Sequence, residues 1–226
     1  MCHVVVFTGG LFPPKSVLNG FFEKTSLPTI CIAADSGYDT ALSLGYTPDL
    51  VVGDMDSISS LSVLKTISKD RIILWPHDKD YTDTEIALME AKKYNPDTIT
   101  LVGGDGGRLD HLFAIQKLFE TSLAPTYWIG KEQTIFFLSA KSKKSKLTIG
   151  DEMMAKNQIS VFSIPEKKWE YEIESEGLEW PLDKVKWNRG EYSLSNRITA
   201  QYSDEGKTAF IQVSKGSFIC IIPHKM

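Results

Sequence analysis

The sequence predicts an α/β protein in which a three-layer domain built on a parallel sheet is followed by a smaller β-rich domain. Over residues 1–140, short β-rich runs alternate with stretches that carry helical signals. After residue 140, short alternating runs follow one another and glycines separate them. Strands separated by helices form parallel sheets with helices on both faces, whereas closely spaced short strands form antiparallel sandwiches or barrels. We therefore expect an α/β domain at 1–140 and a β-rich domain at 141–226.

The expected parallel sheet is defined by six β-rich runs: Val4–Phe7, Thr29–Ala33, Leu50–Val52, Arg71–Leu74, Thr98–Val102 and Thr126–Ile129. The clearest helix follows the fourth run. Thr82 and Glu85 have the spacing of a capping box, which marks a helix start. Behind them, Ala87, Ala91 and Tyr94 repeat at i, i+4 and i+7, so they share one face of that helix.

The β-rich part is defined by five runs: Gln158–Ile164, Trp169–Ile173, Arg197–Tyr202, Thr208–Val213 and Ser217–Ile222. The basic, polar stretch 141–146 precedes them, and we expect it to be a solvated linker or the edge of a hairpin. The spacing of these runs leaves a sandwich and a barrel equally open.

Composition excludes several classes of protein. The net charge is 25 − 29 = −4 and there is no basic tail, which argues against binding to nucleic acid. No apolar run reaches the roughly 18 residues that a membrane span needs. The three cysteines are far apart, which argues against disulfides and a cysteine zinc site. The first residues lack the pattern of a secretory signal, so we expect a cytoplasmic protein.

Aspartates gather in the turns of the expected parallel sheet, because 12 of the 15 lie between residues 35 and 110. Four successive strands each end in an acidic turn, with these residues: Asp35; Asp54 and Asp56; Asp78, Asp80 and Asp83; Asp105 and Asp110. The carboxyl ends of parallel strands meet at one edge of the sheet, where ligands bind. We therefore expect these acids to converge. The alternative is ordinary turn and helix-cap chemistry, which we favour for Asp39, Asp49, Asp70 and Asp97.

Converging carboxylates require neutralisation, since two of them about 4 Å apart repel by roughly 4 kcal/mol at an effective dielectric constant of about 20. The sequence has no cluster of histidines or cysteines that competes as ligand. Oxygen ligands select a hard ion such as Mg²⁺, Mn²⁺ or Ca²⁺. In an α/β protein, Mg²⁺ usually accompanies a phosphorylated ligand.

A glycine-rich stretch supports a phosphate ligand. Residues 103–108 contain four glycines and Arg108, and they lie between a strand and a helix-like segment. Glycines let backbone N–H groups approach an anion, and a guanidinium matches phosphate oxygens. The stretch matches neither the Walker nor the Rossmann pattern. Gly9-Gly10 is either a plain turn or a second phosphate approach, and His111 is either a base or a packed histidine.

Taken together, the motifs resemble those of the thiamin pyrophosphokinase family. They occur in the family's order between about residues 33 and 197: Ala34–Gly37, Gly45–Asp49, Gly53–Ser57, Lys79–Glu85, Gly106–His111, Gly177–Leu182 and Ser195-Asn196. The resemblance implies an α/β catalytic domain followed by a β-sandwich domain, working as a homodimer. It also implies a cleft for thiamin that the partner's sandwich domain helps to build.

The resemblance implies the following roles. The catalytic residues would be Asp54, Asp56, Asp80, Asp83 and Asp110, of which all but Asp110 would handle Mg²⁺. ATP would be bound by Asp35, Lys79, Thr82, Gly106, Gly107, Arg108 and His111, and thiamin by Ser195 and Asn196. The implied reaction is attack of the thiamin hydroxyl on the β-phosphorus of ATP with AMP leaving, and either Asp83 or Asp110 would accept the hydroxyl proton.

The chain departs from the family's pattern at two places. Ile115 stands where the family often has asparagine, and 217–222 lacks the tryptophan that some members place there, so that Phe218 is either a substitute or a buried strand residue. Two alternatives therefore stay open: another Mg²⁺-dependent phospho- or diphosphotransferase, and a nucleotide-binding sensor without catalysis. A third is a carbohydrate-binding or scaffolding role, which would rest on exposure of Trp169, Trp180 and Trp187.

Overall fold

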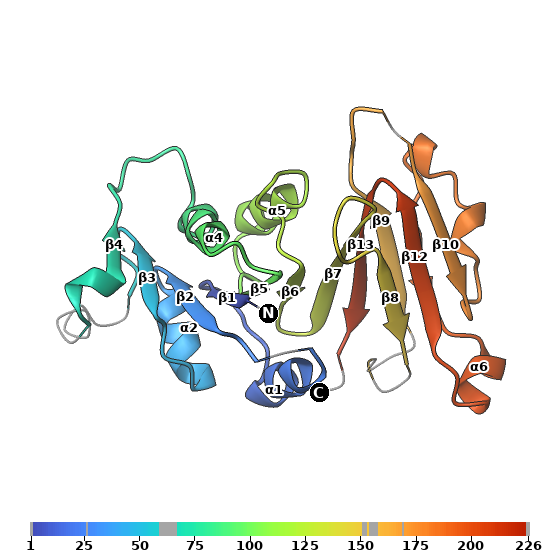
Figure 1. Ribbon diagram of the computed structural model, residues 1–226, viewed down its shortest axis with the longest axis horizontal. Coiled ribbons are helices and arrows are strands. Elements are labelled where there is room, and N and C mark those ends of the chain that lie inside the picture. Colours follow the sequence, from blue (N-terminus) through green and yellow to red (C-terminus); the bar gives the residue numbers. More distant parts are fainter. Residues whose placement is uncertain are drawn as a thin grey trace. The chain divides into compact units, whose positions relative to one another are not determined.

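The computed structural model describes residues 2–25, 27–58, 67–150, 153, 158–168 and 170–224. Trp169 lies outside these ranges. The chain divides into two compact units, Met1–Lys131 and Glu132–Met226 (Figure 1). The strand that immediately precedes the expected boundary at residue 140 lies in the second unit.

The first unit is built on a parallel sheet with the strand order β6-β5-β1-β2-β3-β4, in which each pair of neighbouring strands is parallel. Its strands are β1 (His3–Phe7), β2 (Ile30–Ala34), β3 (Leu50–Gly53), β4 (Ile72–Leu74), β5 (Thr98–Val102) and β6 (Tyr127–Ile129). These match the six runs expected from the sequence. The order reverses at β1, because β2, β3 and β4 lie on one side of it and β5 and β6 on the other. In open α/β sheets such a reversal places a ligand crevice at the carboxyl ends of the strands.

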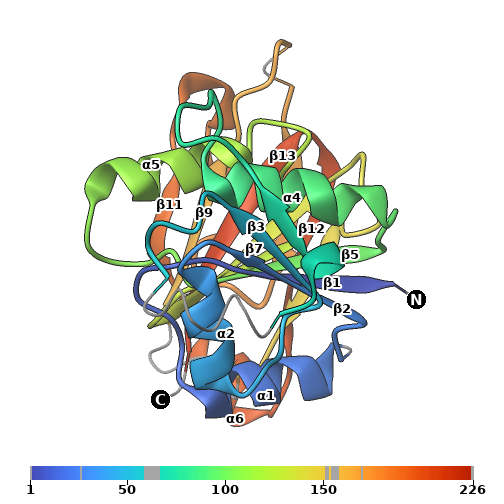
Figure 2. The same ribbon diagram turned by 90° about the vertical axis from the view of Figure 1, so that its left-hand side faces the viewer.

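Helices cover both faces of this sheet, which confirms the three layers (Figure 2). They are α1 (Lys15–Lys24), α2 (Gly37–Leu44), α4 (Asp83–Lys93) and α5 (Leu109–Leu118), with a short 3-10 helix at Lys69–Arg71. Helices α1 and α2 lie on one face, and α4 and α5 on the other. Phe7 of β1 packs with Leu18 and Phe22 of α1 in one core cluster. A fully covered sheet explains why the β-rich runs are almost entirely apolar.

Helix α4 begins as the sequence predicts. The backbone N–H of Glu85 donates to Thr82 Oγ1 at 3.2 Å, and the Thr82 N–H donates to Glu85 Oε2 at 2.8 Å, which completes a capping box. Ala87 and Ala91 are fully buried on the face expected for them. Tyr94 is 45% exposed, because α4 ends at Lys93 and Tyr94 is the capping residue beyond it.

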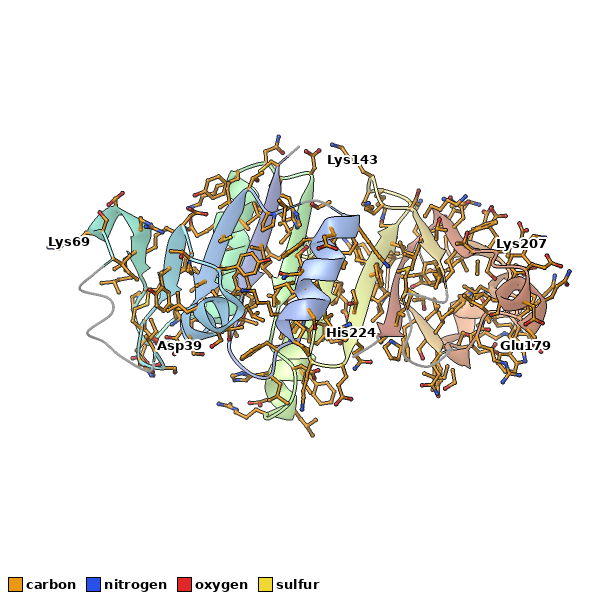
Figure 3. All side chains as sticks on the ribbon, turned by 90° about the horizontal axis from the view of Figure 1, so that it is seen from below. Asp39, Lys69, Lys143, Glu179, Lys207 and His224 are labelled. Carbon is orange, nitrogen blue, oxygen red and sulfur yellow. The ribbon has the colours of Figure 1, made fainter. Side chains whose placement is uncertain are left out.

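The second unit contains two antiparallel sheets, with the orders β11-β9-β13-β7 and β10-β12-β8. Its strands are β7 (Gln133–Ser139), β8 (Lys146–Ile149), β9 (Ile159–Ser163), β10 (Glu172–Glu176), β11 (Ser193–Asn196), β12 (Ala209–Lys215) and β13 (Ser217–Pro223). Phe218 of β13 and Ile211 of β12 are both fully buried, as expected for the inner faces of a sandwich. The structure therefore has a sandwich and not a barrel. Residues 141–145 form an exposed connection from β7 to β8, with Lys143 in it (Figure 3).

One expected strand is wrong. The run Arg197–Tyr202 contains only an isolated bridge at Ile198 and then the helix α6 (Ala200–Asp204). The cause is Thr199, whose side chain accepts a hydrogen bond from the Tyr202 N–H and caps this helix. Two 3-10 helices, Leu182–Lys184 and Trp187–Arg189, complete the unit. In the part of the chain that the structure describes, no helix is long and apolar enough to span a membrane.

Candidate active site

Three of the four acidic turns bring carboxylates together at the carboxyl edge of the parallel sheet. Asp35 follows β2, Asp54 follows β3, and Asp83 opens α4 after β4. One oxygen from each lies within 4.8 Å of the others. Gly53 lies between them, since a Cβ at this position would be 2.8 Å from Asp83 Oδ1 and 3.2 Å from Asp35 Cβ. The close approach of the three acids therefore depends on a glycine at the end of β3.

The backbone of these turns is held in an unusual conformation. Asp35 and Met55 have φ angles of 46° and 65°, in the left-handed region that L-residues rarely adopt. Met55 is 3% exposed and packs with Ala33 and Val51 beneath the turn. Strain of this kind persists where the surrounding structure fixes it. The buried Met55 anchors the turn that carries Asp54 before it and Asp56 after it.

Lys79 is the counter-ion of this group. Its side chain is only 8% exposed, and its Nζ lies 3.2 Å from Asp54 Oδ2 and 3.1 Å from Asp83 Oδ1. Burial opposes the charge on Lys79, but the contacts with Asp83 and Asp54 outweigh it and raise its pKa. Burial likewise opposes the charge on Asp54, yet the bond from Lys79 holds the pKa of that carboxyl below its ordinary value. Burial raises the pKa of Asp35.

Asp83 carries the clearest sign of an incomplete site. Within the described ranges, its Oδ1 is the one buried side-chain polar atom that makes no hydrogen bond. Lys79 Nζ lies within ion-pair distance, but the geometry is not that of a hydrogen bond. The charge of Lys79 is therefore what compensates the burial of this carboxylate oxygen. A set of convergent carboxylate oxygens is the donor set that hard divalent cations prefer, so these residues fit Mg²⁺.

A second group adjoins the first. Asp56 Oδ2 lies 3.6 Å from His77 Nε2, and Asp54, Asp56 and His77 each offer one ligand atom within 4.8 Å of the others. Ser57 Oγ donates to Asp56 Oδ1 at 2.7 Å. The sequence reasoning missed His77. Its position between Pro76 and the acidic residues of the third turn is a signal that could have found it.

Not every predicted acid joins these groups. Asp80 is exposed and belongs to neither of the groups found in the described ranges. In the fourth turn, Asp105 accepts from the Gly106 N–H at 2.8 Å and from the Lys131 N–H at 3.0 Å, so it organises its own loop. Asp110 accepts from Arg108 Nε at 3.1 Å. The carboxylates of three turns therefore converge. Those of the fourth do not, because Asp105 and Asp110 accept hydrogen bonds from residues near their own loop.

The Arg108–Asp110 pair is open to solvent, with side chains 71% and 61% exposed. The hydrogen bond from Arg108 lowers the pKa of Asp110. His111 is exposed in the first turn of α5. Gly106 and Gly107 have φ angles of 67° and 70°, a conformation that glycine adopts at no steric cost. These residues form an accessible loop at the start of α5, where N–H groups suit an anion.

Glycines also allow the backbones of neighbouring turns to pack closely at the point where the strand order reverses. A Cβ at Gly37 would lie 2.1 Å from the Phe7 carbonyl oxygen, and one at Gly103 would lie 2.5 Å from the Thr8 carbonyl oxygen. The Gly104 N–H donates to the Gly9 carbonyl at 2.8 Å. Gly9-Gly10 is therefore part of this backbone packing.

In the second unit, Ser195 and Asn196 differ sharply. Ser195 is exposed with a φ angle of 54°. Asn196 is fully buried, and its amide donates to the Trp180 carbonyl at 2.7 Å and to Ser193 Oγ at 3.3 Å. Its oxygen accepts from the N–H groups of Trp180 and Arg197 at 3.2 and 2.9 Å. An asparagine side chain has two donors and two acceptor sites, so Asn196 is saturated and fixes the segment that carries Trp180.

The two departures from the family's pattern have structural explanations. Ile115 is buried, and its Cδ1 would lie 2.4 Å from a Cβ at Gly104, so it packs beneath the glycine-rich loop. Phe218 is fully buried against Trp187, with ring centroids 5.1 Å apart, so it is a core residue of the sandwich. Trp187 is itself 4% exposed, whereas Trp180 is 51% exposed with Arg197 over its ring.

Residues 24–127 match a protein family described as thiamin pyrophosphokinase, catalytic domain. A thiamine pyrophosphokinase of Bacillus subtilis (strain 168) is 34% identical over 123 residues, which is 53% of this chain and 56% of that relative. The match thus spans little more than half the length of this curated relative.

Solved structures resemble the chain over its whole length. A thiamin pyrophosphokinase family protein of Enterococcus faecalis has a TM-score of 0.72 at 19% identity, covering 100% of both chains. A thiamine pyrophosphokinase of Bacillus subtilis has a TM-score of 0.70 at 23% identity, covering 99% of this chain and 100% of that one. The chain therefore has the fold of these proteins.

Proposed function

We propose, from the confirmed resemblance of this chain to the thiamin pyrophosphokinase family, that it transfers a diphosphoryl group from ATP to the hydroxyl of thiamin. The observation that carries the proposal is the convergence of one carboxylate oxygen each from Asp35, Asp54 and Asp83. Phosphoryl transfer asks mainly for positioning and for neutralisation of charge. A group of carboxylates that fits a hard cation supplies both.

Asp54 and Asp83 of the first group, with Asp56 of the second, would hold Mg²⁺. Asp80, which the resemblance adds to these ligands, is exposed in the third turn. When bound, the ion neutralises phosphate charge and polarises the phosphorus under attack. Asp35 lies next to these ligands, and the resemblance assigns it to the nucleotide. Burial, and to a smaller extent the neighbouring Asp83, raises the pKa of Asp35.

The nucleotide phosphates would be bound by the glycine-rich loop and by the cationic side chains of Arg108 and Lys79. Gly107 can present its backbone N–H group, whereas that of Gly106 is donated to Asp105 and shapes the loop. Arg108 can pair with phosphate oxygens in bidentate fashion because it is exposed. His111 lies one turn further along the same exposed surface. Thr82 contributes by fixing the start of α4, and with it the position of Asp83.

The hydroxyl proton of thiamin would pass to Asp83 or to Asp110. Asp83 is inside the carboxylate group, and its buried Oδ1 lies 3.1 Å from Lys79 Nζ. Asp110 is more accessible, but its pKa is lowered by Arg108, which makes it a weaker base until phosphate takes over that guanidinium. Both assignments remain part of the proposal.

The second unit would bind thiamin and form a homodimer. Tyr192 and Leu194, next to and on edge strand β11, are 56% and 54% exposed, and Phe162 stacks on Tyr192 at 5.4 Å. Exposed apolar side chains on one surface are typical of interfaces. We propose that a second copy covers them, and that Ser195 contacts thiamin while Asn196 positions Trp180 beside it. The free thiols Cys2, Cys31 and Cys220 are consistent with a reducing compartment, and we propose that the enzyme is cytoplasmic.

The test is to incubate the purified protein with thiamin, ATP and MgCl₂ and to separate the products. The proposal predicts thiamin diphosphate and AMP in equal amounts. ADP as product would indicate the alternative of monophosphoryl transfer, and nucleotide binding without any product would indicate the sensor. The feature that favours a sensor is Ile115, whose side chain packs against Gly104 beneath the glycine-rich loop.

A further inference from the structure

Lys79 occupies the place in the carboxylate group that a metal ion would need. Its Nζ lies 3.2 Å from Asp54 Oδ2 and 3.1 Å from Asp83 Oδ1, and these two acids belong to the group of three whose oxygens converge. The Lys79 side chain is 8% exposed, so the ammonium is inside the group and not at its rim. The same two carboxylates are therefore the partners of Lys79 and the candidate ligands of Mg²⁺.

The contact of Lys79 with Asp54 and Asp83 differs from an ion pair that serves only to stabilise the fold. Buried ion pairs that serve a purely structural role satisfy their polar atoms with hydrogen bonds. Here Lys79 donates a hydrogen bond to Asp54 Oδ2 at 3.2 Å, whereas Asp83 Oδ1, 3.1 Å from the same ammonium, is held by the ion pair alone. Lysine is a compact point charge on a flexible stem, and Lys79 comes from the turn between β4 and α4. It can leave the group without breaking a helix or a strand.

We propose that Lys79 is a built-in counter-ion that neutralises Asp54 and Asp83 while the metal is absent and is displaced from them when Mg²⁺ binds. Because the site lies among residues assigned to ATP, the displaced ammonium is then available to a phosphate oxygen. Lys79 is a positioning residue in the first state and a phosphate ligand in the second. This inference rests on the proposed function for the identity of the metal and the nucleotide.

The proposal predicts effects of opposite sign on two ligands. In Lys79→Met, Mg²⁺ no longer competes with an ammonium for Asp54 and Asp83. Because two competing ion pairs are lost, we expect the affinity of the protein for Mg²⁺ without nucleotide to rise on the order of tenfold. A non-hydrolysable ATP analogue in saturating Mg²⁺ loses the Lys79 ammonium as a phosphate partner in the same variant. We expect the affinity of the variant for this analogue to fall about tenfold. Lys79→Arg keeps the charge and should stay within about threefold of the wild type for Mg²⁺ alone.

The experiment is calorimetric titration of the full chain with MgCl₂ alone and then with the analogue, using wild type, Lys79→Met and Lys79→Arg. Lys117→Met is the matched control, because Lys117 also forms an ion pair, 2.8 Å from Glu120, but lies 68% exposed on α5. It should change neither affinity. Equal or weaker Mg²⁺ binding in Lys79→Met would show that Lys79 merely holds the two carboxylates in position, and would overturn the proposal.

A measurement on the wild type covers the case in which Lys79→Met fails to fold. The ¹⁵Nζ resonance of Lys79, assigned by its loss in Lys79→Arg, should shift or exchange faster with solvent as MgCl₂ is added. A resonance that MgCl₂ leaves unchanged, while Mg²⁺ binds, would overturn the proposal. The proposed function is tested separately, because it fails if the wild type makes no thiamin diphosphate. The Mg²⁺ titrations would still decide the role of Lys79 in that case.

Discussion

Gly53→Ala should damage the site and the fold together, for a reason visible in the structure. A Cβ at this position would lie 2.8 Å from Asp83 Oδ1, whereas ordinary contacts begin at 3.4 Å, so the carboxylate must move by 3.4 − 2.8 = 0.6 Å to restore an ordinary contact. Gly53 also has a φ of 143°, where an L-residue costs about 1–3 kcal/mol. We expect the midpoint of thermal unfolding to fall by roughly 5–10 °C.

The same substitution should weaken Mg²⁺ binding, because it pushes Asp83 away from Asp35 and Asp54. Differential scanning calorimetry measures the first effect and titration with MgCl₂ the second. Gly20→Ala is one control, since Gly20 lies within α1 with no atom near its Cβ position, and alanine should stabilise the helix by up to about 1 kcal/mol.

Gly206→Ala is the second control. Gly206 has a φ of 62° but no heavy atom within 4 Å of its Cβ position, so the substitution adds backbone strain of about 1–2 kcal/mol without displacing a carboxylate. It should lower the unfolding temperature and leave Mg²⁺ binding unchanged. If Gly53→Ala binds Mg²⁺ as the wild type does, the reasoning about the packed carboxylates is refuted.

Three further predictions concern single side chains. Asp56→Ala should abolish formation of thiamin diphosphate and leave the circular dichroism spectrum unchanged, since Asp56 is exposed at the site; full activity would remove it from the metal ligands. The pKa of Asp54 is lowered in the folded protein by Lys79, so the pair stabilises the fold above the ordinary carboxyl pKa of about 4 and ceases to do so as the pH falls through the lowered value. Asp54→Asn should therefore reduce the free energy of unfolding at pH 7 and have a diminishing effect toward pH 2; in urea titrations an equal effect at both pH values would contradict the ion pair. Asn196→Ala should cost about 2–4 kcal/mol because it leaves buried polar groups around Trp180 unpaired, whereas Ser195→Ala should leave the unfolding temperature unchanged.

The sequence sufficed for the parallel sheet because local signals and global packing agree there. The apolar runs of β1 to β6 are buried by helices on both faces, and the capping box at Thr82 marks the start of α4. In the second unit, the run Arg197–Tyr202 has strand-forming residues, but a threonine cap at Thr199 starts a helix within it. A local hydrogen bond therefore outweighed β-propensity.

The candidate site was predictable only in part, because sequence order gives the edge of the sheet but not the partners of each side chain. Convergence of Asp35, Asp54 and Asp83 follows from parallel strands. The pairing of Asp110 with Arg108 depends on the path of a glycine-rich loop, which spacing does not reveal. The saturation of Asn196 is likewise set by a segment 16 residues away.

The central claim is that acidic turns from different strands jointly hold one divalent ion. Titration of the protein with Mn²⁺, followed by electron paramagnetic resonance of the free ion, tests it most directly when wild type is compared with Asp83→Asn. We predict one tight site in the wild type and an affinity lower by about tenfold or more in the variant, since ligand charge sets the affinity of such sites. Equal binding by the two proteins would contradict the claim.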